Sequence, residues 1–411
     1  MRHAVRFALA ALATLAFPVS VGATASPAAL SKVIETFVQS HAFSGEILLT
    51  DHGGIVFQRA YGLADRHPKR PISTDTRFQV GSISKWFTTL AALRLADQGR
   101  LDLAAPISRD LPGYPAQVGD HVDLVQLLSN MSGIKDRLST EYINRPEVAA
   151  EALTARQAVD RYALGPLVSR PGTRFDYAHT NWLLVQAILE QASGKPLETL
   201  IRETVLAPAH LTDTGITHGD FRDTPHHAVA YASAVADAPE EVHVIPAYLI
   251  PTGTIYSTAA DMSRLAHLVY ETSWLSQASM KALMTVHDPD EHYAIGGRVL
   301  QQHLDGRPVR LAWEMGSMGG FKALLAHAVH DDRTLVLLNN TNLDEDELSR
   351  FAESILKAWY GAAPPEKDAN VPLHLTTPVG LGVPDEAPSL ERRKKAGPPR
   401  EPGLVWHQQA S

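Results

Sequence analysis

A serine and a lysine with the spacing of a nucleophile and its base lie at Ser82 and Lys85, within residues 78–90 (FQVGSISKWFTTL). A serine hydroxyl is a weak nucleophile until a neighbouring group removes its proton, and a lysine can do so only as the neutral amine. Apolar residues recur at helical spacing from here to Gly99, which is a suitable helix stop. Because residues three apart share one helix face, the spacing predicts that the lysine reaches back to the serine.

The same spacing occurs again at Ser132 and Lys135, in NMSGIKD. Ser-x-x-Lys arises by chance about once in a chain of this length. A glycine follows Ser132 directly, which is typical of a loop rather than of a helix. We therefore expect the lysine amine to reach the serine hydroxyl in the Ser82 match and not in the Ser132 match.

The composition excludes several classes of protein. The chain has 411 residues, 45% hydrophobic content, a net charge of −8 and no cysteine. The absence of a long basic block argues against nucleic-acid binding, and the absence of cysteine excludes disulfides and thiolate metal sites. There is no His-Glu-x-x-His motif and no Gly-x-Ser-x-Gly elbow, so we expect no metal, no cofactor and no α/β-hydrolase fold.

The two ends differ from the body of the chain. Arg2 and Arg6 precede a short apolar run at 7–17, then Pro18 and small residues, which is typical of a secretory signal peptide at 1–25. Cleavage is expected near Ala23 or Ala25, giving a periplasmic or secreted protein without an integral membrane segment. Residues 364–411 are proline-rich and predict a flexible tail, whose role stays open.

The body predicts an α/β (α+β) fold with strands at both ends and helices between them. An α/β part is expected from about 26–100 and 290–363, with a helical part inserted at about 101–289. The groove between two such parts suits a small-molecule site. The expected elements are helices at 30–40, 181–193 and after the cap at 257–258, a final helix in EDELSRFAESILKAWYG, hairpin strands at 46–50 and 55–61, and strands in HYAIGGRVLQQHLD, FKALLAHAVHD and RTLVLLNN.

An ordered set of stretches, spread from residue 43 to residue 360, resembles the serine β-lactamase and penicillin-binding protein family. The nearest likeness is to its branch of class C β-lactamases, D-peptidases and family VIII esterases. This resemblance implies a β-lactamase-like hydrolase domain at 26–363, with an antiparallel sheet flanked by helices. The stretches are FSGEILLTDHGGIVFQRAYGLAD, TRFQVGSISKWFTTLAALRLADQGRLDLAAPISRDLPGYP, VDLVQLLSNMSGI, PGTRFDYAHTNWLLVQAILEQASGKPLETLI, PTGTIYSTAADMSRL and WEMGSMGGFKALLAH.

The resemblance also implies roles for individual residues. Ser82 would be the acylated nucleophile, Lys85 the base that takes its proton, and Tyr177 the second proton carrier, whose tyrosinate could activate water. The backbone N–H groups of Ser82 and Ser317 would form the oxyanion hole.

Two landmarks depart from the family pattern. The tyrosine motif, usually Tyr-x-Asn, ends here in His179, and the late Lys-x-Gly or His-x-Gly motif reads Glu-Met-Gly from Glu314 to Gly316. By resemblance, His179, Glu314 and Gly316 would contact substrate. Three interpretations stay open: His179 pairs with Glu314, Asn181 takes the asparagine's role while His179 points away, or activity has been lost.

The sequence thus predicts an exported serine hydrolase acting through an acyl-Ser82 intermediate on an ester, a peptide or other amide, or a β-lactam. A carboxylate at Glu314 would repel anionic substrates, so neutral or amine-bearing substrates are expected to be favoured. The alternative is a catalytically silent binding protein of the same fold that senses cell-wall fragments. Substrate identity and oligomeric state stay open.

Overall fold

The centre of the molecule is a six-stranded antiparallel sheet in the order β2-β1-β11-β10-β9-β8. The computed structural model describes residues 27–361 except 146, 149–150, 218 and 242–245, so the expected signal peptide and tail lie outside the described residues. Strands from the two ends of the chain meet where β1 pairs with β11. The strands are β1 (Gly45–Asp51), β2 (Gly54–Tyr61), β8 (Arg298–Leu304), β9 (Arg307–Met318), β10 (Phe321–Ala328) and β11 (Arg333–Asn339).

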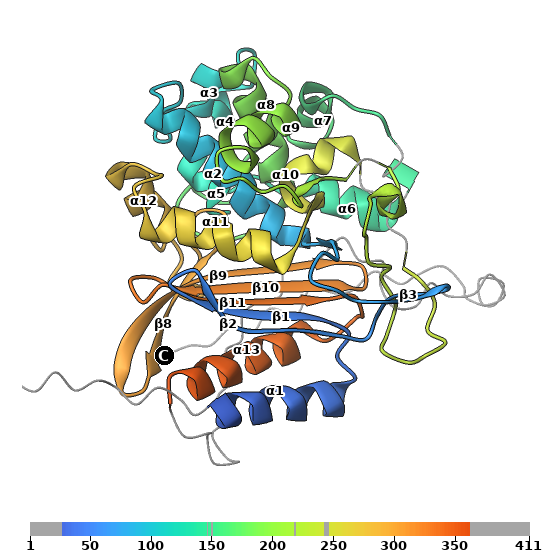
Figure 1. Cartoon of the computed structure of the whole chain (residues 1–411). Helices are drawn as coiled ribbons and strands as arrows, with labels where there is room; N and C mark the ends of the chain where they lie inside the picture. The colour runs from blue at the N-terminus through green and yellow to red at the C-terminus, as the bar shows by residue number, and fades with distance from the viewer. Residues whose placement is uncertain (1–26, 146, 149–150, 218, 242–245, 362–411) are drawn as a thin grey trace, which may run out of the picture.

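Helices cover both faces of this sheet (Figure 1). On one face lie α1 (Pro27–His41) and α13 (Glu345–Trp359), and on the other lie α2 (Ser84–Asp97) and α11 (Ala259–Glu271). Alternate side chains of each strand point to opposite faces. On β9, Trp313 and Met315 pack into the core under α1 and α13, whereas Ala312 packs into the larger core under α2 and α11. The predicted fold, an antiparallel sheet flanked by helices with an inserted helical part, is confirmed.

The inserted helical part lies above the α2 face of the sheet in Figure 1. Its α8 is buried along most of its length and packs against α5 and α7. No described helix is long and apolar enough to cross a bilayer. The remaining elements are α3 (Ile107–Asp110), α4 (Ala116–Gly119), α5 (Leu124–Leu128), α6 (Arg137–Asn144), α7 (Ala155–Tyr162), α8 (His179–Ser193), α9 (Leu197–Ile201), α10 (Ile250–Gly253), α12 (Gln277–Leu283), β3 (Leu63–Arg66), β4 (Lys69–Pro71), β5 (Phe78–Gln79), β6 (Gly215–Ile216) and β7 (Ile255–Ser257).

Several local signals in the sequence correspond to observed boundaries. Gly99 and Gly194 both adopt a φ of +67°, the left-handed conformation that glycine tolerates after a helix. Thr258 caps α11 by accepting a hydrogen bond from the backbone N–H of Asp261. One expectation needs correction: Ser82 lies in the 3₁₀ turn η1 (Gly81–Ile83), and α2 begins only at Ser84.

Candidate active site

The site is built where β9 crosses close to η1, and two glycines permit this approach. Gly81 has a φ of +52°, and a Cβ on it would lie 2.5 Å from the carbonyl oxygen of Ser317. A Cβ on Gly316 would lie 2.0 Å from the carbonyl oxygen of Val80 and 2.8 Å from the backbone nitrogen of Ser82. Any side chain at either glycine would push the two segments apart. The segments that carry the Ser82 and Ser317 backbone N–H groups are therefore adjacent.

Two polar side chains converge on the Oγ atom of Ser82. Lys85 Nζ lies 3.2 Å from it, and the Tyr177 hydroxyl donates to it at 3.1 Å. Lys85 also donates to the carbonyl oxygen of Thr252 at 3.3 Å, and its Nζ lies 4.8 Å from the centre of the Tyr177 ring and 5.8 Å from that of Trp182. The structure thus brings together the three residues that the sequence singled out for catalysis.

Burial shifts the pKa values of Lys85 and Tyr177. It lowers the pKa of Lys85 to about 7, against the opposing charge of Asp136, so a large fraction of the amine is neutral near pH 7. Burial raises the pKa of Tyr177, so its hydroxyl keeps its proton in the resting protein. Lys85 can therefore accept the Ser82 proton, while Tyr177 begins as a hydrogen-bond donor rather than as a tyrosinate.

His179 pairs with Asp136, a residue that the sequence analysis did not single out. Its Nδ1 lies 3.7 Å from Asp136 Oδ2 and 3.0 Å from Ser139 Oγ, and its backbone N–H donates to the same carboxylate at 3.0 Å. Burial lowers the pKa of His179, although Asp136 opposes this. The proposed pairing with Glu314 is therefore not the arrangement found, because the His179 ring is held by the N-terminus of α6.

Asp136 joins α6 to α8. It caps α6 by accepting from the backbone N–H of Ser139 at 3.2 Å, and it accepts from the Thr180 hydroxyl at 2.9 Å. Burial alone would raise its pKa, but the hydrogen bonds from His179 and Ser139 outweigh burial and hold the pKa well below its ordinary value. A fixed negative charge thus lies close enough to Lys85 to act on its pKa. An aspartate directly before a helical stretch is a capping signal that could have revealed this role.

Asn181 belongs to a separate buried polar group. Its Oδ1 accepts from Ser132 Oγ at 2.6 Å, and its Nδ2 donates to Asn130 Oδ1 at 3.2 Å. Ser132 itself lies in a loop, where its hydroxyl also accepts from the backbone N–H of Ile134. The second Ser-x-x-Lys match therefore supplies a structural serine, and Asn181 does not take the asparagine's place beside Lys85.

Glu314 points toward the α2 face of the sheet, and its side chain is buried against Gly297. A Cβ on Gly297 would lie only 2.1 Å from Oε1 of this carboxyl. Burial raises the pKa of Glu314 well above its ordinary value, with Arg298 opposing this only in part. Burial thus favours the neutral acid more than in a free glutamate, and the repulsion of anionic substrates by Glu314 stays a prediction.

A hollow of about 700 Å³ reaches the candidate site through Tyr177, which lines its wall together with His179, whereas Ser82 and Lys85 do not line it. Phe175 and Ile143 supply apolar surface, and the only cationic side chain in its lining, Arg174, is paired with Asp176 at 3.1 Å. The lining also carries five carboxylates, at Asp136, Asp176, Asp288, Asp290 and Glu291. Glu291 is paired with Arg298 at 3.4 Å, and the lining as a whole carries more negative than positive side chains.

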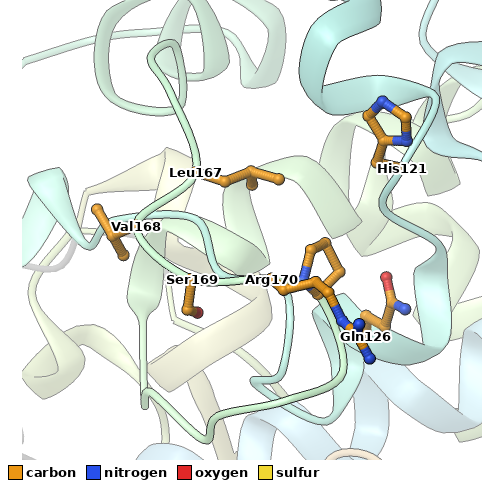
Figure 2. Close-up of a pocket in the computed structure, with 7 residues that line it drawn as sticks. His121, Gln126, Leu167, Val168, Ser169 and Arg170 are labelled. Atoms are coloured by element: carbon orange, nitrogen blue, oxygen red, sulfur yellow. The ribbon is translucent and has the colours of Figure 1, made fainter.

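A second hollow of about 560 Å³, shown in Figure 2, lies on the loop at 167–171, with His121 and Gln126 beside it. Ser82, Lys85 and Tyr177 do not line this hollow, so it lies apart from the candidate site. The described side chains with the spacing of metal ligands, Glu271, His327 and Asp332, line neither hollow.

Comparison with known proteins shows the family to which the chain belongs and its fold. The β-lactamase family model matches residues 30–357. A penicillin-binding protein of Bacillus subtilis is 26% identical over 349 residues, covering 80% of this chain and 74% of that protein. A D-aminopeptidase of Cereibacter sphaeroides is 28% identical over 369 residues, covering 85% and 67%. The solved structure of EstCE1, described as a hydrolase with promiscuous acyltransferase activity, superposes with a TM-score of 0.66 at 23% identity, covering 82% of this chain and 99% of that one.

Proposed function

The chain belongs to the β-lactamase family, and on this premise we propose that it is an exported serine hydrolase that forms an acyl-enzyme on Ser82. The observation that carries the proposal is the convergence of Lys85 and Tyr177 on one serine oxygen. Export rests on the signal-peptide pattern at 1–25.

Acylation uses the resting protonation states. Neutral Lys85 takes the Ser82 proton as Oγ attacks the substrate carbonyl carbon. The backbone N–H groups of Ser82 and Ser317 stabilise the negative charge that develops on the carbonyl oxygen. As the bond to the leaving group breaks, Tyr177 protonates that group. The site then holds an acyl-Ser82, a Lys85 ammonium and a Tyr177 phenolate.

Deacylation reverses these proton transfers. The phenolate of Tyr177 takes a proton from water as the water oxygen attacks the acyl carbon. Oγ of Ser82 leaves and takes back its proton from Lys85. Both side chains thus return to their starting states, and the net reaction is hydrolysis of one acyl bond.

The acidic hollow favours neutral or amine-bearing substrates over anionic ones. Five carboxylates and one guanidinium line it, so a substrate carboxylate there would face like charge. At 4 Å, such repulsion costs about 1 kcal/mol in water and about 4 kcal/mol in a partly shielded site. Similarity to a protein named D-aminopeptidase supports the same direction. Penicillins carry a carboxylate, so we place them below neutral esters and amides.

The test compares p-nitrophenyl esters with acyl chains of equal length that end in trimethylammonium, tert-butyl or carboxylate. The first two ends have nearly the same shape, so their difference isolates charge. We expect kcat/KM to fall from the cationic to the neutral to the anionic ester, with the anionic ester at least about tenfold below the neutral one. Equal or better hydrolysis of the anionic ester would contradict the proposed substrate class.

Matched variants locate the source of this preference. Asp290→Asn should reduce the ratio of kcat/KM for the cationic ester to kcat/KM for the anionic ester, because Asp290 is an exposed residue in the lining of the hollow. Asp305→Asn, in the exposed turn between β8 and β9, should leave this ratio unchanged. The preference for the cationic ester over the anionic ester should also decrease as ionic strength rises, because salt screens the charges of the hollow.

The silent binding protein remains the alternative from another class. It would keep the acidic hollow but would not react at Ser82, so covalent labelling of that serine separates the two functions. The contacts of Lys85 and Tyr177 with Ser82 favour the enzyme.

A further inference from the structure

Four ionisable side chains gather where the end of α11 meets the hairpin between β10 and β11. Nε2 of His327, on β10, lies 2.9 Å from Oε1 of Glu271, on α11. Ligand atoms of Glu271, His327 and Asp332 all lie within 4.8 Å of one another. Nδ1 of His267, one helical turn before Glu271, lies 2.8 Å from Oδ2 of Asp332. The group therefore joins the helix to the hairpin.

Surrounding contacts fix the orientation of these groups. Nδ1 of His327 lies 2.8 Å from Oγ1 of Thr334, which leaves Nε2 directed at the carboxylates. The ring of His327 is fully buried and stacks on Tyr270, with a centroid separation of 5.1 Å and an interplanar angle of 19°. The backbone N–H of His330 donates to Glu271 at 3.0 Å. Such outer hydrogen bonds to ligating histidines and carboxylates are usual at metal sites.

The two carboxylates of this group favour the binding of a cation. Two carboxylates, Glu271 and Asp332, lie close together, and within the described part of the chain their ion pairs involve only histidines. Two carboxylates close together at a largely buried position repel each other, and a cation bound between them would remove this repulsion.

We propose that this group binds one first-row divalent cation such as Zn²⁺. Nε2 of His327 and the carboxylates of Glu271 and Asp332 supply three ligands, His267 donates a hydrogen bond to Asp332, and water completes the shell. An imidazole ligand favours zinc and similar metals over Mg²⁺ and Ca²⁺.

This metal site is separate from the reaction centre. The group lies at the Ala328 end of β10, whereas Ser317, next to the nucleophile, pairs with Lys322 near the other end. The five steps along β10 from Lys322 to His327 span roughly 17 Å at about 3.3 Å per residue. The cation would therefore stabilise the junction of α11 with the hairpin and take no part in acylation. The chain has no His-Glu-x-x-His motif, so no metal was expected from the sequence. The ligands proposed here come from a helix and a hairpin and form no continuous motif.

The test uses the untagged full-length protein after removal of metals with a chelator. Titration with Co²⁺, followed by visible absorption, and with Zn²⁺, followed by calorimetry, should each give one site per chain. The midpoint of thermal unfolding should rise with Zn²⁺ concentration, because a ligand that binds only the folded state stabilises it.

Variants assign the site. Glu271→Gln and Asp332→Asn should abolish binding, and His267→Ala should weaken it by about 10–100-fold. His303→Ala, at an exposed position on β8, and Ser82→Ala should bind as the native protein does. Circular dichroism of each metal-free variant verifies that it is folded. Absence of one-to-one binding in the native protein, or full binding in folded Glu271→Gln, would overturn the proposal.

Discussion

The Nζ atom of Lys85 lies 3.2 Å from the Oγ atom of Ser82, and burial lowers the pKa of this lysine to about 7. Both facts follow from the position of Lys85 in the first turn of α2, beneath the inserted helical part. Lysine with its ordinary pKa of 10.5 would be charged at neutral pH and could not accept a proton. Because of burial, this Ser-x-x-Lys spacing gives a lysine that can accept a proton from the serine beside it.

The rate of acylation should depend on pH through Lys85. The neutral amine is the active form, so kcat/KM for a neutral ester should rise with pH, with an apparent pKa near 7, and then level off. Stopped-flow release of p-nitrophenol from pH 5 to 9, corrected for spontaneous hydrolysis, measures this. Lys85→Ala should lose the rising limb and most of the activity. A flat native profile would rule out Lys85 as the base.

Asp136 should influence the pH at which kcat/KM rises. Its negative charge raises the pKa of Lys85, in opposition to burial. Asp136→Asn should therefore lower the pKa of Lys85 and move the rising limb to lower pH. Asp176→Asn provides a matched control in the same hollow, because Asp176 is not among the charges that shift Lys85. A shift to higher pH in folded Asp136→Asn would contradict the electrostatic argument.

Asp136→Ala should also destabilise the fold. The change removes the cap of α6 and leaves His179 and Thr180 without their buried partner. Loss of a helix cap costs about 0.5–2 kcal/mol, and buried donors left without an acceptor cost about 1–3 kcal/mol more. Urea unfolding of the variant should therefore show a much lower midpoint than that of Asp136→Asn, which retains an acceptor oxygen.

Tyr177→Phe should slow both chemical steps. The hydroxyl protonates the leaving group and its phenolate then activates water, so its loss should cost about 10²–10⁴-fold in kcat. An activated ester, whose leaving group needs no proton, bypasses the first of these roles. Burst kinetics should therefore show that Tyr177→Phe slows acylation by that ester less than acylation by an alkyl ester. Unchanged steady-state turnover would remove Tyr177 from the mechanism.

Glu314 gives a prediction about stability and pH. Because its pKa is raised in the folded protein, its contribution is fully present below its unfolded pKa of about 4.5 and is lost as pH rises. Glutamine cannot ionise. The free energy of unfolding of Glu314→Gln should therefore rise relative to that of the native protein above pH 4.5, by up to about 1.4 kcal/mol per pH unit. Thermal unfolding of both proteins from pH 4.5 to 8 tests this. A constant difference would show that Glu314 does not have a raised pKa.

Much of the architecture could be predicted from local patterns. Hydrophobic periodicity indicated α8 and α13, and their observed bounds are His179–Ser193 and Glu345–Trp359. The twelve-residue strand β9 was not predicted as a strand. Buried on both faces over part of its length, and ending in EMGSM, it lacks a clean alternation of apolar and polar residues.

The sequence predicted which residues form the site but not all of the contacts between them. Order along the chain and resemblance to a family suggested Ser82, Lys85 and Tyr177, and the structure brings them together. The partner of His179 could not be found this way, because Asp136 is 43 residues earlier and meets His179 only through the packing of α6 on α8. The same holds for the cluster around His327, whose members come from different elements.

The central claim is that Ser82 carries the acyl group. The native protein and two variants, Ser82→Ala and Ser132→Ala, are incubated with a fluorophosphonate probe, and the labelled peptide is identified by mass spectrometry. We expect one adduct per chain on Ser82, retained in Ser132→Ala and absent from folded Ser82→Ala, with hydrolysis falling by at least about a thousandfold. Labelling of Ser132, or a native protein that takes no label while it hydrolyses esters, would contradict the account.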